Sequence, residues 1–374
     1  MKMAIREFRL ERFLAEREFR APYVLGASDS ETMSVQELLS LEPGSEDNLL
    51  RMRLGYVEPA GSPPLRETIA ELYSGVSPDE VITFNGASEG IVAFMMTALQ
   101  PGDHVIVQFP AYQSLYEVAR SIGCDVTLWQ MDEEKGWSPE IGMLQELVRP
   151  ATKVIVINSP HNPTGYQFPE SDVMGLVRFA EEHGITIFSD EVYRLLEHRA
   201  DDRLPAMVDM PGAHVSLGDT SKAYGLAGLR VGWIATHDRD LLGRLANYKD
   251  YSTICNSAPG EFFAGIALRH RGKIVARNQE IVRRNVRLLD DFFTAWSDLF
   301  SWVRPRGGTT AFPRLKSEAG AFAFCTGLLE SAGVLLVPGT VFEHDDAHIR
   351  FGYGRLDMPE ALERLDGYLR TRSG

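Results

Sequence analysis

The chain is poor in cysteine, with three residues in 374: Cys124, Cys255 and Cys325. They are odd in number, lie far apart and form no Cys-x-x-Cys pair. These features argue against a disulfide framework and against a zinc knuckle. We therefore expect reduced thiols and a cytoplasmic location.

Long apolar runs and basic blocks are also missing. Residues 1–20 alternate charged and apolar side chains, so we expect neither a signal peptide nor a membrane span there. Acidic residues outnumber basic ones by 52 to 38, which gives a formal net charge of -14. This balance argues against a nucleic-acid or anionic-membrane surface and favours a small-molecule substrate.

What the chain does contain is a repeated alternation of short β-branched runs and helical patterns. Its length, with 44% hydrophobic residues, is enough for two domains with ample core. Alternation of this kind is typical of an α/β fold with a largely parallel sheet. We count about seven strand-like runs: Val81-Gly86, His104-Pro110, Asp125-Met131, Lys153-Pro160, Thr186-Tyr193, His214-Ser221 and Arg230-Ala235.

The pattern changes after about Ser257, where helices (Glu261-Arg271, Ile274-Leu299) and short β-like pieces follow. We predict a large domain over residues 46–257 and a smaller α+β domain over 258–374. An N-terminal segment, residues 1–45, is expected to pack on the smaller domain. Internal repeats and low-complexity linkers are not found in the sequence.

One run, Asp219 to Trp233, carries a lysine beside hydroxyls, glycines and a downstream arginine. A lysine captures a carbonyl as a Schiff base when its amine is held near the substrate and readily loses its proton. Lys222 is thus a candidate for binding a phosphate-bearing aldehyde, for which pyridoxal 5'-phosphate (PLP) is the usual partner.

Two further motifs lie where apolar β-runs end: Ser159 to Gly165 (SPHNPTG) and Phe188 to Arg194 (FSDEVYR). Together with the lysine run, and in this order, they resemble the active-site signature of the fold-type-I, class I/II aminotransferases. The resemblance covers roughly residues 50–355. It implies a PLP-dependent enzyme in which Lys222 holds the cofactor and, once freed, acts as the base.

A phosphate group needs N–H donors at a helix N-terminus together with a cation. The turn Gly86, Ala87 and Ser88 opens the helix predicted over Glu89-Leu99 and provides such donors. By the resemblance, Arg230 and the hydroxyl of Ser221 complete the predicted phosphate site.

The resemblance assigns four residues to the cofactor ring. Asp190 keeps the ring nitrogen protonated, which the ring requires in order to act as an electron sink. Tyr193 and Asn162 hydrogen-bond the phenolic oxygen, and Tyr112 covers one ring face. The catalytic residues are thus expected to be Lys222, Asp190 and Tyr193.

The substrate and a partner subunit account for the remaining matches. Arg350 resembles the arginine that pairs with the substrate α-carboxylate through two parallel hydrogen bonds, and Asn162 is expected to contact the substrate as well. Tyr56 matches a tyrosine that reaches the phosphate of the neighbouring subunit. The resemblance therefore implies a homodimer with shared active sites.

The chain departs from the family pattern at two motif positions. Asp219 replaces a serine that donates to the phosphate, so it either turns to Arg230 or a backbone N–H, or contacts a cationic part of the substrate. His161 replaces an asparagine and is expected to be a turn residue rather than a proton relay. A cluster from Glu343 to His348 contains metal-ligand residue types, but we predict no metal because a polar loop does not make them converge.

Two reactions remain open, because fold and cofactor do not determine the steps that come after removal of the α-proton. The first is transamination of an α-amino acid. The second is cyclisation, dehydration or oxidation of a hydroxyarginine-type amino acid, since Asp219, the short N-terminus and Gly307-Phe312 look similar to the capreomycidine-synthase-like group. A third interpretation, a transcriptional regulator on the same fold, requires a DNA-binding domain for which the N-terminus is too short.

Overall fold

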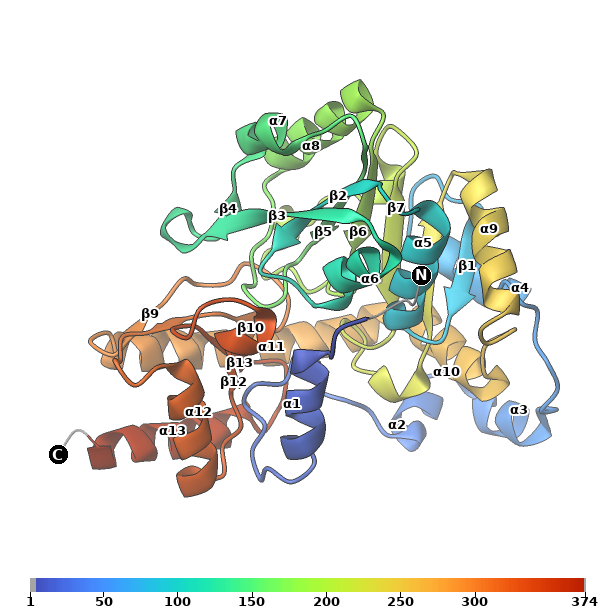
Figure 1. The fold of residues 1–374 in the computed structure, drawn as a ribbon. Helices are drawn as coiled ribbons and strands as arrows, with labels where there is room; N and C mark the ends of the chain where they lie inside the picture. Colours follow the sequence, from blue (N-terminus) through green and yellow to red (C-terminus); the bar gives the residue numbers. More distant parts are fainter. Residues whose placement is uncertain (1–4, 373–374) are drawn as a thin grey trace.

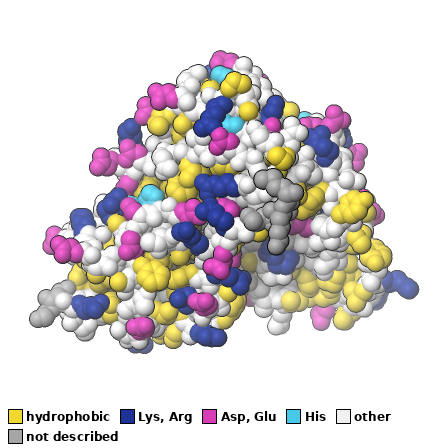
Figure 2. Space-filling view, viewed as in Figure 1, with side chains coloured by type: hydrophobic (Ala, Val, Ile, Leu, Met, Phe, Trp, Pro, Cys, Tyr) yellow, Lys and Arg dark blue, Asp and Glu magenta, His cyan; other side chains and the backbone are white. Residues whose placement is uncertain are grey.

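A computed structural model gives the fold and describes residues 5–372. Helices cover both faces of a large sheet, and a smaller group of helices and short strands lies beside one edge of it (Figure 1). Acidic and basic side chains are interspersed over the face shown in Figure 2.

The large sheet has the strand order β1-β8-β7-β6-β5-β2-β3-β4. Its central strands, from β7 through β6, β5 and β2 to β3, are parallel, whereas β1 and β4 pair antiparallel at the two edges and β8 runs antiparallel to both of its neighbours. The strands are β1 (Val81–Phe84), β2 (His104–Phe109), β3 (Asp125–Asp132), β4 (Ser138–Pro139), β5 (Thr152–Asn158), β6 (Thr186–Asp190), β7 (Val215–Asp219) and β8 (Gly232–Thr236).

The predicted α/β fold is confirmed, and each of the seven predicted runs overlaps a strand of this sheet. The central strands are apolar on both sides because both of their faces are covered. In β2, Val105 and Val107 join the hydrophobic cluster on one face and Ile106 joins the cluster on the other, as the two-residue period of a strand requires. The prediction missed β4, whose two residues carry no strand signal.

Helices α5 (Ala87–Ala98), α6 (Ser114–Ile122) and α9 (Arg239–Asp250) cover one face, and α7 (Leu144–Leu147) and α8 (Glu170–His183) cover the other. The remaining helices are α1 (Arg9–Arg17), α2 (Val35–Leu39), α3 (Ser45–Arg51), α4 (Pro63–Ala70), α10 (Ala258–Arg269), α11 (Arg271–Ala295), α12 (Ala321–Ala332) and α13 (Met358–Arg372).

The smaller group of elements has its own hydrophobic cluster, built from α11, α12, α13 and short strands. These strands are β9 (Phe300–Ser301), β10 (Thr310–Ala311), β11 (Arg314–Leu315), β12 (Val337–Pro338) and β13 (Ile349–Gly352). The N-terminal segment joins them, because Tyr23 forms a parallel bridge with Val334 and the Gly26 N–H donates to the Leu335 carbonyl at 2.8 Å.

The domain limits 1–45, 46–257 and 258–374 stay predictions, since hydrophobic clusters cross them: one cluster contains both Leu10 and Ile106, and another continues into α11 at Ile274. Within residues 5–372, no helix combines the length and the apolar character that crossing a membrane requires.

Candidate active site

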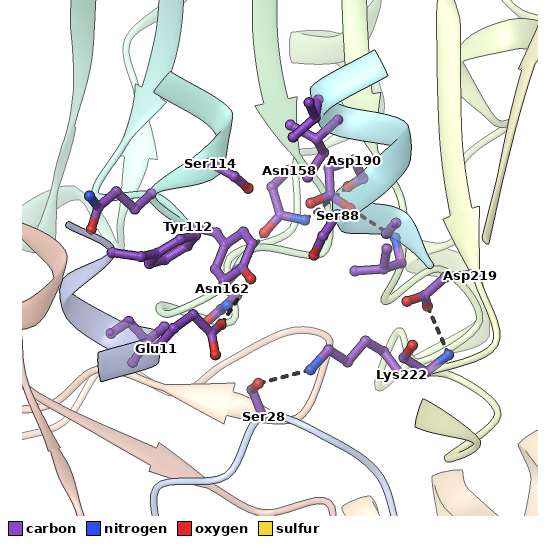
Figure 3. Close-up of a pocket in the computed structure, with 18 of the residues that line it drawn as sticks. Glu11, Ser28, Ser88, Tyr112, Ser114, Asn158, Asn162, Asp190, Asp219 and Lys222 are labelled. Atoms are coloured by element: carbon purple, nitrogen blue, oxygen red, sulfur yellow. Dashed lines mark hydrogen bonds between the residues drawn. The ribbon is translucent and has the colours of Figure 1, made fainter. Parts of the chain in front are cut away.

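The polar residues at the carboxyl ends of the parallel strands meet at one edge of the sheet. Asn158 ends β5, Asp190 ends β6 and Asp219 ends β7, and in the register Asn158 lies beside Asp190. They face a cavity of about 560 Å³ (Figure 3). Open parallel sheets bind ligands at this end of their strands.

The cavity gathers nearly all of the predicted site residues. Those that line it are Ala87, Ser88, Tyr112, Asn162, Asp190, Tyr193, Asp219, Ser221, Lys222, Arg230 and Arg350. Gly86 caps α5 directly before Ala87 and does not itself line the cavity. Tyr56 does not line the cavity and has 88% of its surface exposed.

Lys222 reaches into the cavity from the turn that follows β7, and its amine donates a hydrogen bond to Ser28 Oγ at 3.0 Å. The Tyr193 hydroxyl donates to the carbonyl of the same serine at 3.0 Å. Burial lowers the pKa of Lys222, but the charges of Tyr193, Asp29 and Asp219 oppose burial and leave the pKa above its usual value. The protein groups alone therefore do not supply the readily lost proton that Schiff-base formation requires.

Asp190 is buried, with 5% of its surface exposed, and Oδ1 accepts the Val192 N–H at 3.3 Å. Burial raises the pKa of this carboxyl to about 7. Among residues 5–372 no cation forms an ion pair with it. A positively charged group placed beside it would restore its ionised form.

A cup for an anion forms where β1 leads into α5. Gly86, with φ +90°, caps the helix and leaves its first N–H groups without a side-chain partner. A Cβ at this position would lie 2.1 Å from Arg230 Nη2, so only glycine lets the guanidinium approach the cup. Arg230 Nη1 donates to Ser221 Oγ at 3.4 Å and to the Ala227 carbonyl at 2.8 Å.

Asparagines and a tyrosine complete the middle of the cavity. The backbone N–H of Asn162 donates to Asn158 Oδ1 at 2.7 Å, and Asn158 Nδ2 donates to the Asp190 carbonyl at 2.9 Å. The Tyr112 hydroxyl donates to Glu11 Oε1 at 2.9 Å. Asn158 thus ties the turn that carries Asn162 to the strand that carries Asp190.

Arg350 lies on β13 at the opposite wall and is almost fully buried, with 1% of its surface exposed. Its Nε and Nη2 donate to the Gly26 carbonyl at 3.1 and 2.9 Å, and Nη1 donates to Asn162 Oδ1 at 3.3 Å. Burial lowers the pKa of the guanidinium. The Gly26 carbonyl therefore fixes the orientation of the Arg350 guanidinium, the group expected to bind a carboxylate.

Asp219 and His161, the two departures from the family pattern, both have hydrogen-bond partners within the protein. Asp219 Oδ1 accepts the backbone N–H of Ser221 at 3.0 Å, and burial raises the pKa of its carboxyl. His161 is a buried turn residue: its carbonyl accepts the Gly165 N–H at 2.7 Å, and burial lowers the pKa of its ring to about 3. It does not line the cavity.

The ligand atoms of His344, Asp345 and His348 lie within 4.8 Å of one another, closer than expected of a polar loop. His348 Nδ1 contacts Asp345 Oδ1 at 2.7 Å, and its Nε2 contacts Glu133 Oε2 at 3.1 Å. Arg314 also donates to Glu133, at 2.7 Å. The ring nitrogens of His348 and the two carboxylates are thus engaged with one another, and the absence of a metal stays a prediction.

Among the cavity residues that sequence reasoning missed are Glu11, Ser28 and Asn158. Asn158 ends a predicted strand four residues before Asn162, so its position was a usable signal. Glu11 and Ser28 carry no such signal, because their partners Tyr112 and Lys222 lie 101 and 194 residues away in the chain.

The sequence matches the family described as Aminotransferase class I and II over residues 25–365. The chain belongs to this family. It is 30% identical to a capreomycidine synthase of Streptomyces vinaceus over 97% of this chain and 94% of that protein. It is also 30% identical to an aspartate/prephenate aminotransferase of Thermus thermophilus over 83% of this chain and 82% of that protein.

Among solved structures, a PLP-dependent aminotransferase from Streptococcus suis superimposes with a TM-score of 0.93 at 34% identity, covering 99% of both chains. The fold-type-I prediction and the PLP prediction are thereby confirmed, and the chain is an enzyme of a PLP-dependent family. Its relatives span both of the reactions left open by the sequence.

Proposed function

We propose that this protein is an aminotransferase that removes the amino group of an α-amino acid and passes it to an α-keto acid. The observation that carries the proposal is that one cavity holds the Lys222 amine, the Asp190 carboxylate and the Arg350 guanidinium. These groups are, respectively, a base, a partner for a protonated ring nitrogen and a receptor for a carboxylate.

The residues present fit PLP. Asp190 is a buried carboxylate whose pKa burial raises to about 7, and the absence of a Cβ at Gly86 leaves room for Arg230. When bound, PLP supplies an aldehyde for the amine and a ring that withdraws electrons from the α-carbon. Ser88, Ser221 and Arg230 would hold its phosphate, and Tyr112, Asn162 and Tyr193 would surround its ring.

This chain's own residues then have separable tasks. Arg350 fixes the substrate carboxylate, which orients the α-C–H bond toward the Lys222 amine. Lys222 takes the α-proton and carries it to a neighbouring carbon. Because its pKa is raised by Tyr193, Asp29 and Asp219, the amine must first lose a proton before it can act as a base.

The proposal includes a homodimer located in the cytoplasm. Tyr56 lies outside the cavity of its own chain and is 88% exposed, which supports a role toward a neighbouring subunit. Mixing a Lys222→Ala chain with a Tyr56→Phe chain tests this directly. If the mixture regains activity, the result supports active sites that are shared between two subunits. If each site is built from one subunit alone, the mixture stays as inactive as the two variants measured separately.

A second candidate function is a cyclase or dehydratase of a hydroxyarginine-type amino acid. It is favoured by the similarity to capreomycidine synthase, which extends over 97% of the chain. The initial α-proton removal is common to both candidates, and they differ in what leaves afterwards.

The test is product analysis with the PLP-loaded enzyme and a panel of amino acids in deuterium oxide, with and without an α-keto acid. Deuterium at the α-carbon supports the removal of the α-proton that both candidates share. Lys222→Ala is the matched control and should abolish this deuterium incorporation. A keto acid product together with the amino form of the cofactor supports the aminotransferase. A dehydrated product that keeps its α-nitrogen, with PLP regenerated, supports the second candidate. Failure of every amino acid to exchange its α-proton contradicts both.

A further inference from the structure

The N-terminal segment forms the wall of the cavity opposite Lys222. Its side chains that line the space are Ile5, Arg6, Phe8, Leu10, Glu11 and Leu14. The aminotransferase motifs lie on the other walls, so this wall is free to contact whatever the substrate carries beyond its α-carbon. The chemistry of this wall therefore bears on which side chain the enzyme accepts.

Glu11 is the acidic member of this wall. Its Oε1 accepts the Tyr112 hydroxyl at 2.9 Å, and the Tyr112 ring contacts the Phe8 ring with centroids 4.9 Å apart. Figure 3 shows the Glu11 carboxylate and the Lys222 amine facing the same open space from opposite sides. Within residues 5–372, no Lys, Arg or His lies within ion-pairing distance of Glu11.

The other charged side chains on and beside this wall have partners within the protein, and Arg350 is the cavity cation on which the charge of Glu11 acts. Glu117 pairs with Arg6 and with Arg120, and Arg6 also pairs with Glu343. Asp190 and Asp219 lie at the strand ends near Lys222. The charge left over on the N-terminal wall is thus negative, and the one arginine of that wall is held by two carboxylates.

From this geometry we propose that Glu11 is the specificity-determining residue and selects amino acids with a cationic side chain, an amine or a guanidinium. The inference rests on the proposed function, because it takes the substrate to be an amino acid fixed by Arg350. A carboxylate accepts charge-assisted hydrogen bonds from such a group and repels an acidic side chain. A neutral side chain of the same shape gains neither the charge nor the full set of hydrogen bonds.

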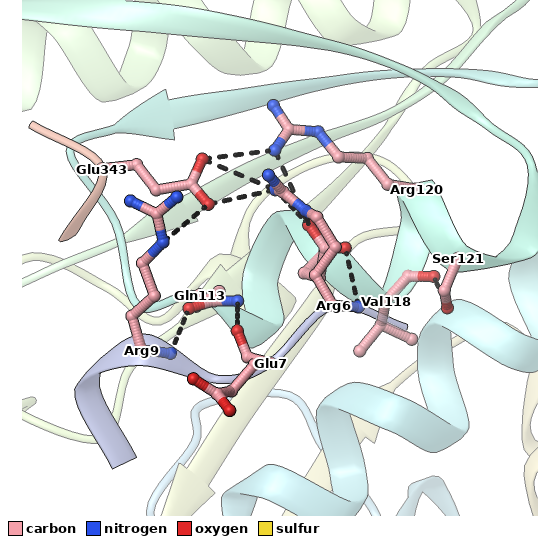
Figure 4. A network of polar contacts seen from close by, with 9 residues as sticks. Arg6, Glu7, Arg9, Gln113, Val118, Arg120, Ser121 and Glu343 are labelled. Carbon is pink, nitrogen blue, oxygen red and sulfur yellow. Dashed lines mark hydrogen bonds and ion pairs between the residues drawn. The ribbon is translucent and has the colours of Figure 1, made fainter. Parts of the chain in front are cut away.

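A network of ion pairs holds this wall in place (Figure 4). Arg6 pairs with Glu117 of α6 and with Glu343 at 3.1 Å, and Arg9 pairs with Glu343 at 3.9 Å. The backbone N–H of Arg9 donates to Gln113 Oε1 at 2.9 Å. A fixed helix presents Glu11 in one position, which lowers the entropy lost when a substrate binds.

The test compares arginine with citrulline, its uncharged near-isostere, by their dissociation constants for the PLP-loaded enzyme, read from the change in cofactor absorbance. We expect arginine to bind about tenfold or more tightly than citrulline, and glutamate to bind more weakly than either. Glu11→Gln keeps an oxygen for the Tyr112 hydroxyl and should bring the arginine to citrulline ratio to about one. Glu16→Gln, on the same helix with 71% of its side chain exposed, is the matched control and should keep the wild-type ratio.

Equal affinity of the wild-type enzyme for arginine and citrulline overturns the inference, whether or not the variant folds. So does a Glu11→Gln variant that weakens both ligands alike, since Glu11 would then act only by positioning Tyr112. Tighter binding of glutamate than of arginine overturns the inference and leaves the proposed function standing. If no amino acid changes the absorbance, the proposed function fails first and the inference with it.

Discussion

Replacing Asp190 with asparagine should have opposite effects on the protein without and with its cofactor. The carboxyl is buried, with 5% of its surface exposed, and burial raises its pKa to about 7 from an ordinary value of 3.8. Asparagine has nearly the same shape and no charge. The substitution therefore isolates the free energy of burying this charge.

The magnitude comes from linkage between proton binding and folding. A carboxyl with a raised pKa binds more protons in the folded than in the unfolded state, so its contribution to stability is complete below pH 3.8 and is lost as the pH rises to about 7. A shift of about three units corresponds to roughly 4 kcal/mol. Relative to wild type, apo Asp190→Asn should gain about 3 kcal/mol in free energy of unfolding between pH 5 and pH 8.

The assay is urea unfolding of the two apoproteins at pH 5 and pH 8, at one protein concentration because an oligomer would otherwise change the midpoint. With PLP bound, the protonated ring nitrogen should return Asp190 to its ionised form, and the variant then lacks a buried charge pair. We expect its turnover to fall by at least a hundredfold, since breaking such a pair costs about 3 to 5 kcal/mol.

The same difference in stability between variant and wild type at pH 5 and pH 8 would refute the assignment of a raised pKa to Asp190. A near wild-type turnover of the loaded variant would refute its role beside the ring nitrogen. The two results are independent, so one can fail while the other holds.

Three further outcomes are expected. Lys222→Ala should abolish the visible absorbance band of the loaded enzyme and its borohydride-reducible linkage, and a linkage that persists would identify another lysine as the anchor. Gly86→Ala should weaken PLP binding by about tenfold or more in a fluorescence titration, because its Cβ would lie 2.1 Å from Arg230 Nη2, while Gly102→Ala, with φ +93° and open space around it, should lose stability only. Arg350→Lys should raise KM for every amino acid by a similar factor of about ten, and a change confined to one side-chain class would contradict carboxylate binding.

Much of the fold could be read from the sequence because the information is local. The runs that became β2 and β5 are rich in apolar, β-branched residues, and the two-residue period of β2 assigns Val105 and Ile106 to opposite faces. Residues at the strand ends could be assigned to the site directly, since parallel strands bring their carboxyl ends to one edge. Asp190 and Asp219 lie at such strand ends, although the motifs and the family resemblance had already singled them out together with Lys222.

The rest depends on contacts between distant parts of the chain. Strand β4 exists because Ser138 and Pro139 pair with β3, not because of their own propensity. Glu11 and Ser28 each bind a partner more than 100 residues away in the chain, and no local pattern encodes such pairs. The raised pKa of Lys222 also required the structure, because it depends on which carboxylates and which tyrosine lie nearby.

The attachment of the N-terminal segment has a consequence for how each copy of the protein is made. The Gly352 N–H donates to the Leu25 carbonyl at 2.6 Å, the Gly26 N–H donates to the Leu335 carbonyl, and Arg350 binds the carbonyl of Gly26. The ribosome adds these partners more than 300 residues after the segment itself, an interval of roughly 15 to 65 s at usual elongation rates. The motif-bearing strands β5 to β7 are synthesised in the meantime, so the contacts that attach Leu25 and Gly26 to the C-terminal part of the chain form only after these strands have been made.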